Sequence, residues 1–328
     1  MRPFTYTRAA DASDAFRNAQ AKQTHYLAGG TTLIDLMKLD VVRPDALVDI
    51  NPLRSSLSKI ELSGDRLKIG ALANMANVAA DENIRKSFPV IAQSLELAAS
   101  PQIRNMATLG GNVLQRTRCT YFRDVSYPCN KRAPGSGCSA LHGVTRTHAV
   151  LGASEHCIAT YPGDFAQALI ALDAQVELQG RAGTRIIPFK DLHRQPGDQP
   201  QIETSLQPGE LVTGFVIEGG PFKRSKYLKI RDRESYEFAL SSVAVALTLD
   251  GEVAKDIRIA LGGVATVPWR ASEAEKMLQG KPLSDAGIVE AATAAFAGAR
   301  TTPDNEFKVR LGRQAIVRAL REVRVMEV

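Results

Sequence analysis

Residues 28–38 read AGGTTLIDLMK and directly follow a short run at 25–27 that predicts a β-strand. Leu33, Leu36 and Met37 recur at helical spacing, so the stretch predicts a strand, a glycine turn and a helix in that order. Glycine lets the backbone turn sharply and approach a ligand closely. Successive amide groups of such a turn, next to the positive end of a helix, form a binding site for an anion such as a diphosphate.

A second glycine turn, TLGGN, occupies residues 108–112, and its threonine and asparagine offer further hydrogen-bond donors. A single glycine turn is more often structural than ligand-binding, and neither turn continues into the Gly-Lys-Ser/Thr of a P-loop. The stretch GSGCSA at 135–140 matches the spacing of a dinucleotide-binding motif. It follows a proline in a polar loop instead of a strand, so we reject it as such a motif.

All four cysteines of the chain fall in one segment, with the spacing C-x9-C-x8-C-x18-C. They are Cys119, Cys129, Cys138 and Cys157. The residues between them are rich in proline and glycine and show no lasting apolar period, which predicts a loop. Four thiolates complete the ligand set of a cubane iron–sulfur cluster or of a structural zinc ion, and a metal centre would order such a loop.

Three interpretations of the cysteines stay open at this point. Zinc sites usually contain close C-x2-C pairs, which are absent here, so the wide spacing favours an iron–sulfur cluster over zinc. Zinc is still an alternative because His142, His148 and His156 lie in the same segment. Two disulfides would suit a chain exported unfolded, but the first residues, MRPFTYTRAADASDAF, are polar and contain no apolar signal peptide.

The composition is that of an ordinary globular protein, and the 328 residues suffice for two or three domains. No apolar run reaches the ~18 residues that a membrane span requires. The net charge is +6, and no basic stripe with interleaved aromatic residues points to nucleic acid. Basic residues do gather near the first cysteines, either as a solvated face or as compensation for an anionic cofactor. They are Arg104, Arg116, Arg118, Arg123, Lys131 and Arg132.

The order of predicted elements divides the chain into three parts. Residues 1–54 form a small α/β unit with a first helix at 12–22, and residues 55–219 form a second unit that contains the cysteine loop. In that unit we predict a helix over 74–99, interrupted near Pro89, and strands near 67–69, 148–151, 158, 176–178 and 211–217. Asp164 is expected to cap a further helix.

Residues 220–328 have a different pattern, which predicts a C-terminal antiparallel sheet with helices. The stretches KYLKI at 226–230, SSVAVALTL at 241–249 and DIRIALGGV at 256–264 read as strands. Asp250-Gly251 between the last two is a strong hairpin signal. Helices are expected at 271–279, 284–298 and 313–324.

The two glycine turns in this order resemble the FAD-binding medium subunit of the xanthine dehydrogenase and molybdenum hydroxylase family. The resemblance continues through PGDFAQALIALDAQVEL at 162–178, through 229–247 and through ALGGVATVPWRA at 260–271, so it covers essentially the whole chain. It implies an α+β fold. That fold is a two-part FAD-binding domain of the p-cresol methylhydroxylase and vanillyl-alcohol oxidase type, followed by the C-terminal sheet.

Within that family the cysteine loop, at about 115–157, is an insertion. RTRCTYFRDVSYPCNKRAPGSGCSAL at 116–141 is similar to the flavoprotein subunits of bacterial periplasmic aldehyde oxidoreductases. There the insertion holds a [4Fe–4S] cluster, so the resemblance implies that Cys119, Cys129, Cys138 and Cys157 are its ligands.

The resemblance also implies the residues that bind FAD. The first loop would wrap the diphosphate, and the second would reach the diphosphate and the flavin side. Asp164 would lie near the adenosine half and Lys229 near the flavin ring. Tyr236 and Phe238 are aromatic candidates near the flavin, but core packing explains them more simply. The residues of the two loops are Ala28, Gly29, Gly30, Thr31, Thr32 and Leu33, then Thr108, Gly110, Gly111 and Asn112.

By this resemblance the chain is one subunit of a three-part aldehyde oxidoreductase. A large partner would carry the molybdenum cofactor, a small partner two [2Fe–2S] clusters, and this chain would pass electrons through FAD to a soluble acceptor. No residue of this chain is then expected to be catalytic. The alternatives are a zinc-stapled nucleic-acid-binding module and a self-sufficient flavin oxidase. The expected location is the periplasm, by co-export with a partner, or else the cytoplasm.

Overall fold

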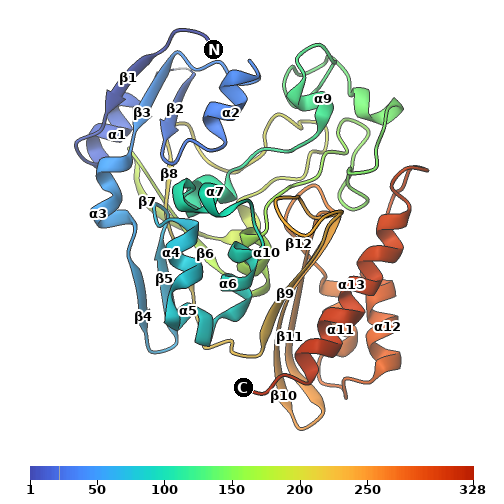
Figure 1. Cartoon of the computed structure of the whole chain (residues 1–328). Helices are drawn as coiled ribbons and strands as arrows, with labels where there is room; N and C mark the ends of the chain where they lie inside the picture. The colour runs from blue at the N-terminus through green and yellow to red at the C-terminus, as the bar shows by residue number, and fades with distance from the viewer. Residues whose placement is uncertain (22) are drawn as a thin grey trace.

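The computed structural model describes residues 1–21 and 23–328 of the chain. Its strands form three sheets that follow one another along the sequence, of three, five and four strands. Figure 1 shows the first sheet beside the top of the second, and the C-terminal sheet standing next to them with its helices on the outside. The expected α+β class is confirmed.

The first sheet is parallel and has the order β1-β3-β2. Its elements are β1 (Thr5–Arg8), α1 (Ala12–Asn18), β2 (Thr24–Leu27), α2 (Leu33–Lys38) and β3 (Ala46–Asp49). The strand, turn and helix predicted for 25–38 are present as β2 and α2. The first helix is shorter than predicted, because it ends at Asn18.

The second sheet has the order β4-β5-β8-β6-β7, and all its neighbouring strands are antiparallel. Its strands are β4 (Ile60–Ser63), β5 (Arg66–Gly70), β6 (Gln175–Gly180), β7 (Gly183–Pro188) and β8 (Leu211–Ile217). The short helices η1 (Asn51–Leu53) and α3 (Arg54–Leu57) precede it, and η3 (Phe189–Asp191) follows β7. β7 is a strand that we did not predict.

Residues 74–99 are mostly helical with a break next to Pro89, as predicted, but a further break at Asp81 divides the stretch into three helices. Asp81 has an extended backbone and its side chain accepts a hydrogen bond from the amide of Ile84, so it begins a new helix. Phe88, with φ −141° and ψ 55°, lies outside the helical region, as the residue before a proline tends to, and Pro89 begins the next helix. The helices are α4 (Met75–Ala80), α5 (Glu82–Ser87) and α6 (Pro89–Glu96), followed by α7 (Pro101–Met106), α8 (Leu109–Val113) and later α10 (Phe165–Ala171).

The third sheet is antiparallel, with the order β12-β11-β10-β9. The hairpin predicted at Asp250-Gly251 joins β10 to β11, and Gly251 has a positive φ of 58° there. The last helix begins at Phe307 instead of residue 313. The elements are β9 (Ser225–Ile230), β10 (Ser241–Asp250), β11 (Val253–Gly262), β12 (Trp269–Arg270), α11 (Ser272–Leu278), α12 (Asp285–Ala294) and α13 (Phe307–Arg324).

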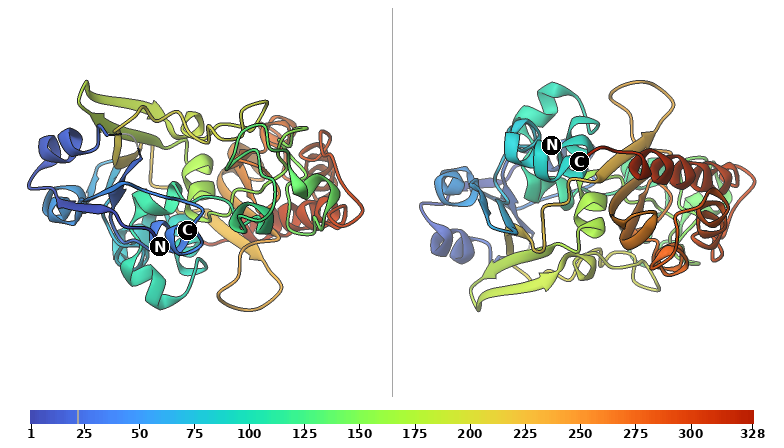
Figure 2. Two further views of the ribbon diagram at one scale, coloured as in Figure 1. Left: turned by 90° about the horizontal axis from the view of Figure 1, so that it is seen from above. Right: turned by 90° about the horizontal axis from the view of Figure 1, so that it is seen from below.

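Both faces of this sheet are buried. Val243, Val245 and Leu247 of β10 belong to a core shared with α11, α12 and α13. The alternate residues Ala244 and Ala246 belong to the core of the second unit, where α6 and α10 pack. Figure 2 shows α11 to α13 gathered at the far end of the molecule from the first sheet. The C-terminal sheet is therefore packed between two layers of helices.

The cysteine loop contains little regular structure, only α9 (Thr120–Arg123) and η2 (Ser139–His142). The strands predicted at 148–151 and 158 are wrong, since only isolated bridges occur there. The amides of Val150 and Leu151 both donate to one carbonyl, that of Val264, so no ladder forms. At the base of the loop, the Thr117 hydroxyl donates to the carbonyl of Thr160 at 2.9 Å, and the Thr160 hydroxyl donates to the carbonyl of Thr147 at 2.6 Å.

Among residues 1–21 and 23–328, no helix is both long and apolar enough to cross a bilayer.

Candidate cofactor site

The two glycine turns, far apart in the sequence, meet at one cavity of about 350 Å³, which we call the turn cavity. It is lined by Ala28 to Leu33 of the first turn and by Thr108, Gly110 and Gly111 of the second. A neighbouring cavity of about 490 Å³, the loop cavity, shares Thr31, Thr32 and Gly111 with it. Each volume lies in the range of small-molecule sites, and the shared residues make the two cavities neighbours at the turns.

The first turn supplies free amide groups. Within the described part of the chain, the amides of Gly29, Gly30, Thr31 and Thr32 donate to no backbone or side-chain oxygen. Gly30 has a positive φ of 73°, which glycine adopts readily. Thr32 begins α2 without a side-chain capping bond. Four unpaired donors in succession are available to an anion, so the anion site stays a prediction with donors to supply it.

The second turn is less open than predicted, because residues 109–113 form the helical turn α8. The side chain of Thr108 accepts from the amide of Gly111 at 3.4 Å, and the amide of Gly110 donates to the carbonyl of Ala71 at 2.8 Å. Asn112 contributes instead through its side chain. Its Oδ1 is buried without a partner among the described residues, and Asn112 lines the loop cavity. A buried acceptor of this kind fits a ligand that donates a hydrogen bond.

Asp164 and Lys229 are in direct contact, although the resemblance implied positions near different parts of FAD. Asp164 Oδ2 accepts from Lys229 Nζ at 2.9 Å, and Asp164 Oδ1 accepts from the hydroxyl of Tyr227 at 2.6 Å. Lys229 also donates to the carbonyl of Leu97. Asp164 lines the loop cavity, but Lys229 lines neither cavity. Asp164 is the N-cap residue of α10, as predicted, but its side chain makes no capping hydrogen bond there.

Tyr227 is a residue of this site that the sequence analysis missed. Burial and the Asp164 carboxylate raise the pKa of Tyr227 well above its ordinary value, so its hydroxyl stays protonated and donates. Tyr227 and Lys229 are two residues apart on β9 and therefore point to the same face of the sheet. The alternation of side chains along a strand could have indicated that Tyr227 lies on the same face as Lys229.

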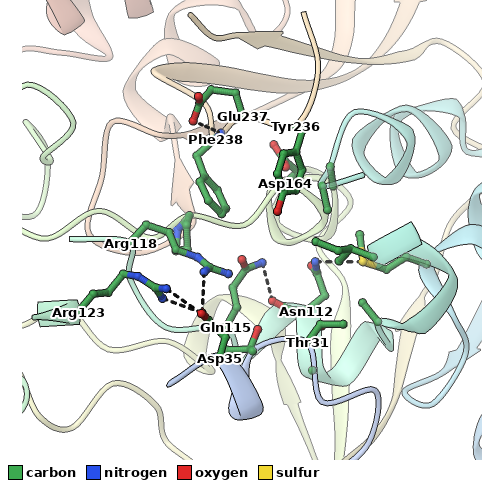
Figure 3. A pocket seen from close by; sticks show the side chains of 18 of the residues that line it. Thr31, Asp35, Asn112, Gln115, Arg118, Arg123, Asp164, Tyr236, Glu237 and Phe238 are labelled. Atoms are coloured by element: carbon green, nitrogen blue, oxygen red, sulfur yellow. Dashed lines mark hydrogen bonds and ion pairs between the residues drawn. The ribbon is translucent and has the colours of Figure 1, made fainter. Parts of the chain in front are cut away.

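Tyr236 and Phe238 are not core residues, so that expectation is wrong. Their side chains are 54% and 40% exposed, and both line the loop cavity. The guanidinium of Arg118 lies over the Phe238 ring, 4.8 Å from its centroid. Figure 3 shows Phe238, Tyr236, Asp164 and Asn112 around one space. In Figure 2 the connection between β9 and β10, which carries the two aromatic residues, projects from the body of the molecule. Aromatic side chains at a cavity mouth suit a planar ligand.

The basic residues near the cysteines are mostly paired. Arg118 and Arg123 both contact the carboxylate of Asp35, as Figure 3 shows. Burial opposes ionisation of Asp35, but hydrogen bonds from the two guanidinium groups outweigh it and lower its pKa.

The remaining members of the basic cluster also have protein partners. Arg116 and Lys131 contact Glu203, whereas Arg104 and Arg132 donate to backbone carbonyls. Asp35 and Glu203 thus pair with four of the six basic residues and leave the cluster with a net positive charge. These four side chains are partly buried, which does not favour a solvated face. Arg118 and Arg123 line the loop cavity, and compensation of an anionic cofactor there stays a prediction.

The four cysteines gather in one small cluster with Phe122, in which Cys119, Cys129 and Cys157 are buried and Cys138 is partly buried. All are free thiols, which does not support the disulfide alternative. In the described residues, no three His, Cys, Asp or Glu side chains could hold one metal ion. Ligands of a single zinc must each approach it to about 2.3 Å or less, so the thiol positions do not favour zinc. Burial raises the pKa of Cys119 to about 12 and that of Cys157 to about 11.

Of the three histidines in the segment, His148 is the one that contacts a cysteine. Its Nε2 lies 3.2 Å from Cys119 Sγ, whereas His142 and His156 are exposed. Burial and the nearby Lys308 lower the pKa of His148 to about 4, so the ring is neutral near pH 7.

Comparisons with known proteins find matches over nearly the whole chain. Residues 2–217 match the model of the FAD binding domain in molybdopterin dehydrogenase, and residues 226–323 match the CO dehydrogenase flavoprotein C-terminal domain. The chain is 44% identical to the aldehyde oxidoreductase FAD-binding subunit PaoB of Escherichia coli over 99% of both chains. It is 28% identical to the glyceraldehyde dehydrogenase medium chain of Sulfolobus acidocaldarius over 86% of this chain and 83% of the relative.

Solved structures share the fold. The reconstituted CO dehydrogenase from Oligotropha carboxidovorans superimposes with a TM-score of 0.77 at 24% identity, covering 99% of both chains. Quinoline 2-oxidoreductase from Pseudomonas putida superimposes with a TM-score of 0.76 at 21% identity, covering 98% of this chain and 97% of that chain. Both neighbours include the first, second and C-terminal units described above.

Proposed function

Because the chain belongs to the family of FAD-binding subunits of molybdopterin dehydrogenases, we propose that it serves a molybdenum-dependent aldehyde oxidoreductase as its FAD-binding, electron-transferring subunit. The aldehyde assignment is supported by the full-length similarity to the Escherichia coli aldehyde oxidoreductase subunit. Molybdenum chemistry would belong to a partner chain.

The convergence of both glycine turns on one cavity is the observation that carries this proposal. The four free amides of Gly29 to Thr32 would hold the diphosphate of FAD. Asn112 would orient the cofactor through its unpartnered Oδ1, and Tyr236 and Phe238 would cover the mouth of the loop cavity. Bound there, FAD supplies a group that takes electrons singly and releases them in pairs.

The residues of this chain then bind, orient and shield the cofactor, and none needs to act on the aldehyde. The predicted partners are a large molybdenum-cofactor subunit, a small subunit with two [2Fe–2S] clusters, and a soluble acceptor. The medium-chain names of several relatives support an assembly of this kind. Co-export with a folded partner to the periplasm stays a prediction, which cell fractionation tests.

We also propose that Cys119, Cys129, Cys138 and Cys157 bind a [4Fe–4S] cluster. Support comes from the gathering of the four side chains in one small cluster, in which Cys119, Cys129 and Cys157 are buried and Cys138 is partly buried. We expect a mainly structural or auxiliary role, because most family members transfer electrons without this loop.

The test is purification of the chain with its partners under anaerobic conditions. We expect one noncovalent FAD and about four irons and four sulfides from this subunit, and aldehyde oxidation by the complex only. Aldehyde oxidation by the isolated chain would favour the flavin oxidase alternative. A colourless chain that contains zinc and binds nucleic acid would favour the zinc-stapled module.

A further inference from the structure

His148 lies at the junction of the cysteine loop and the C-terminal unit. Its side chain is almost fully buried, and its Nε2 is 3.2 Å from the sulfur of Cys119. The ring also faces Tyr121, with 6.1 Å between the ring centroids. This is a direct contact between an imidazole and one of the four sulfurs assigned to the cluster.

The chemistry of the contact fixes the direction of the hydrogen bond. A cysteine bound to iron is a thiolate, which carries no proton and can only accept. The Nε2 of His148 must therefore be the protonated nitrogen if the contact is a hydrogen bond. In the described residues, Nδ1 has no partner that would compete for that proton.

The ring cannot easily move away from the sulfur, because its backbone is held from both sides. The amide of His148 donates to the carbonyl of Thr145, and the amide of Thr145 donates to Asp304 at 3.0 Å. Lys308, at the start of α13, donates to the carbonyls of Thr147, His148 and Gly263 at 3.2, 3.0 and 2.5 Å. The C-terminal unit thus fixes the histidine against the loop.

A hydrogen bond to a ligating sulfur stabilises the reduced, more negative state of an iron–sulfur cluster more than the oxidised state. We propose that His148 is a positioning residue for Cys119, and that its Nε2–H donates to the Cys119 sulfur and raises the reduction potential of the cluster. This inference rests on the proposed [4Fe–4S] site. It adds a residue that the four-cysteine pattern does not contain.

The experiment is a redox titration of the anaerobically purified complex, followed by electron paramagnetic resonance. H148F removes the donor but keeps a ring, H148Q keeps an N–H donor, and H142F changes an exposed histidine of the same loop as a control. In H148F the equilibrium ratio of reduced to oxidised cluster should fall about tenfold, a shift of 59 mV for one electron. H148Q should lie closer to the wild type, and H142F should match it.

An unchanged midpoint in H148F with full iron content would overturn the inference and leave the cluster proposal intact. If H148F holds too little iron to titrate, H148A with and without added imidazole replaces it. Imidazole should then raise the midpoint toward the wild-type value, and identical midpoints with and without it would overturn the inference. A wild-type complex without a [4Fe–4S] signal would remove the cluster proposal itself, before any variant is made.

Discussion

The Nζ of Lys229 lies 2.9 Å from Oδ2 of Asp164, and the side chains of this pair are only 1% and 5% exposed. Lys229 belongs to β9 of the C-terminal sheet, whereas Asp164 precedes α10 and lines the loop cavity. The pair therefore links the wall of the cavity to the C-terminal unit through a buried ionic contact.

Replacing Lys229 by methionine should strongly destabilise the protein. The Asp164 carboxylate would stay buried with only the Tyr227 hydroxyl as a partner, and an uncompensated buried charge costs about 3–5 kcal/mol. Thermal unfolding and flavin content of the purified complex measure the effect. The double variant K229M/D164N should recover most of the loss.

Lys226 on the same strand provides the control. It pairs with Glu322 at 2.7 Å, with both side chains about one third exposed, so K226M should cost less than about 1 kcal/mol. Equal losses for K226M and K229M would contradict the importance of the buried pair.

Gly111→Val should abolish FAD binding with little effect on folding. Gly111 lines both cavities, and a Cβ added there meets only Thr108 Oγ1, at 3.2 Å. The extra side chain would therefore fill space assigned to the cofactor. Flavin released per chain on heating gives the result, with Gly298→Val, where a Cβ meets nothing within 4 Å, as the control.

Substitutions at the first turn would be less informative. A Cβ at Gly29 would lie 2.1 Å from the carbonyl oxygen of Met106, and Gly30 has a positive φ. Both changes would disturb the fold as well as the site. Full flavin content in G111V would mean that the second turn does not contact FAD.

Cys129→Ser should remove iron and loosen the loop while most FAD is retained. Metal binding and local folding are coupled, whereas the glycine turns lie in the core that flanks the loop. Iron analysis, limited proteolysis and flavin content of the same sample separate these effects. Val144→Ser, at an exposed position of the same segment, should leave all three unchanged. Normal iron content in C129S would exclude Cys129 as a ligand.

The Glu210–Arg185 ion pair predicts that the protein loses stability as the pH falls. Nε and Nη2 of Arg185 donate to the two carboxylate oxygens of Glu210, each at 2.7 Å, and this lowers the pKa of Glu210. A lowered carboxylate pKa means stabilisation that is present above the ordinary value of 4.5 and is lost as the pH falls through the folded value.

The free energy of unfolding of the wild type should therefore exceed that of E210Q by about 1 kcal/mol at pH 7. The difference is small because the side chain of Arg185 is 37% exposed. The difference should shrink toward zero as the pH falls below 4.5. Urea unfolding at several pH values checks this, with E218Q, in the exposed pair with Arg66, as the control. A difference in unfolding free energy that stays constant down to pH 3 would contradict a stabilising role of the ionised Glu210 carboxylate.

Local sequence patterns predicted the parts of the fold that depend on neighbouring residues. The β2–turn–α2 unit and the Asp250-Gly251 hairpin are such cases. The break at Asp81 was missed because capping by one aspartate outweighed the apolar period on both sides. The limits of the three units, at 54/55 and 219/220, stay a prediction that limited proteolysis of the folded chain tests.

The site was predictable as a set of glycines and cysteines, but its charged partners were not. Asp35 and Glu203 pair with four of the basic residues from distant parts of the chain, and the Asp164–Lys229 contact also joins distant segments. Tyr236 and Phe238 were assigned to the core because aromatic residues are usually buried there. The loop that carries them instead projects beside the loop cavity, and no local repeat of apolar residues in the sequence indicates this.

The three threonines at the base of the cysteine loop hold the two ends of this segment together. Thr117, Thr160 and Thr147 are joined in a chain by hydrogen bonds, so the excursion over 118–146 departs and returns at one place on the body. Val150 and Leu151, which help to fill the C-terminal core, lie outside the excursion. Loss of this stretch would remove three of the four cysteines together with Arg118 and Arg123, so the loop cavity would lose part of its wall in the same event.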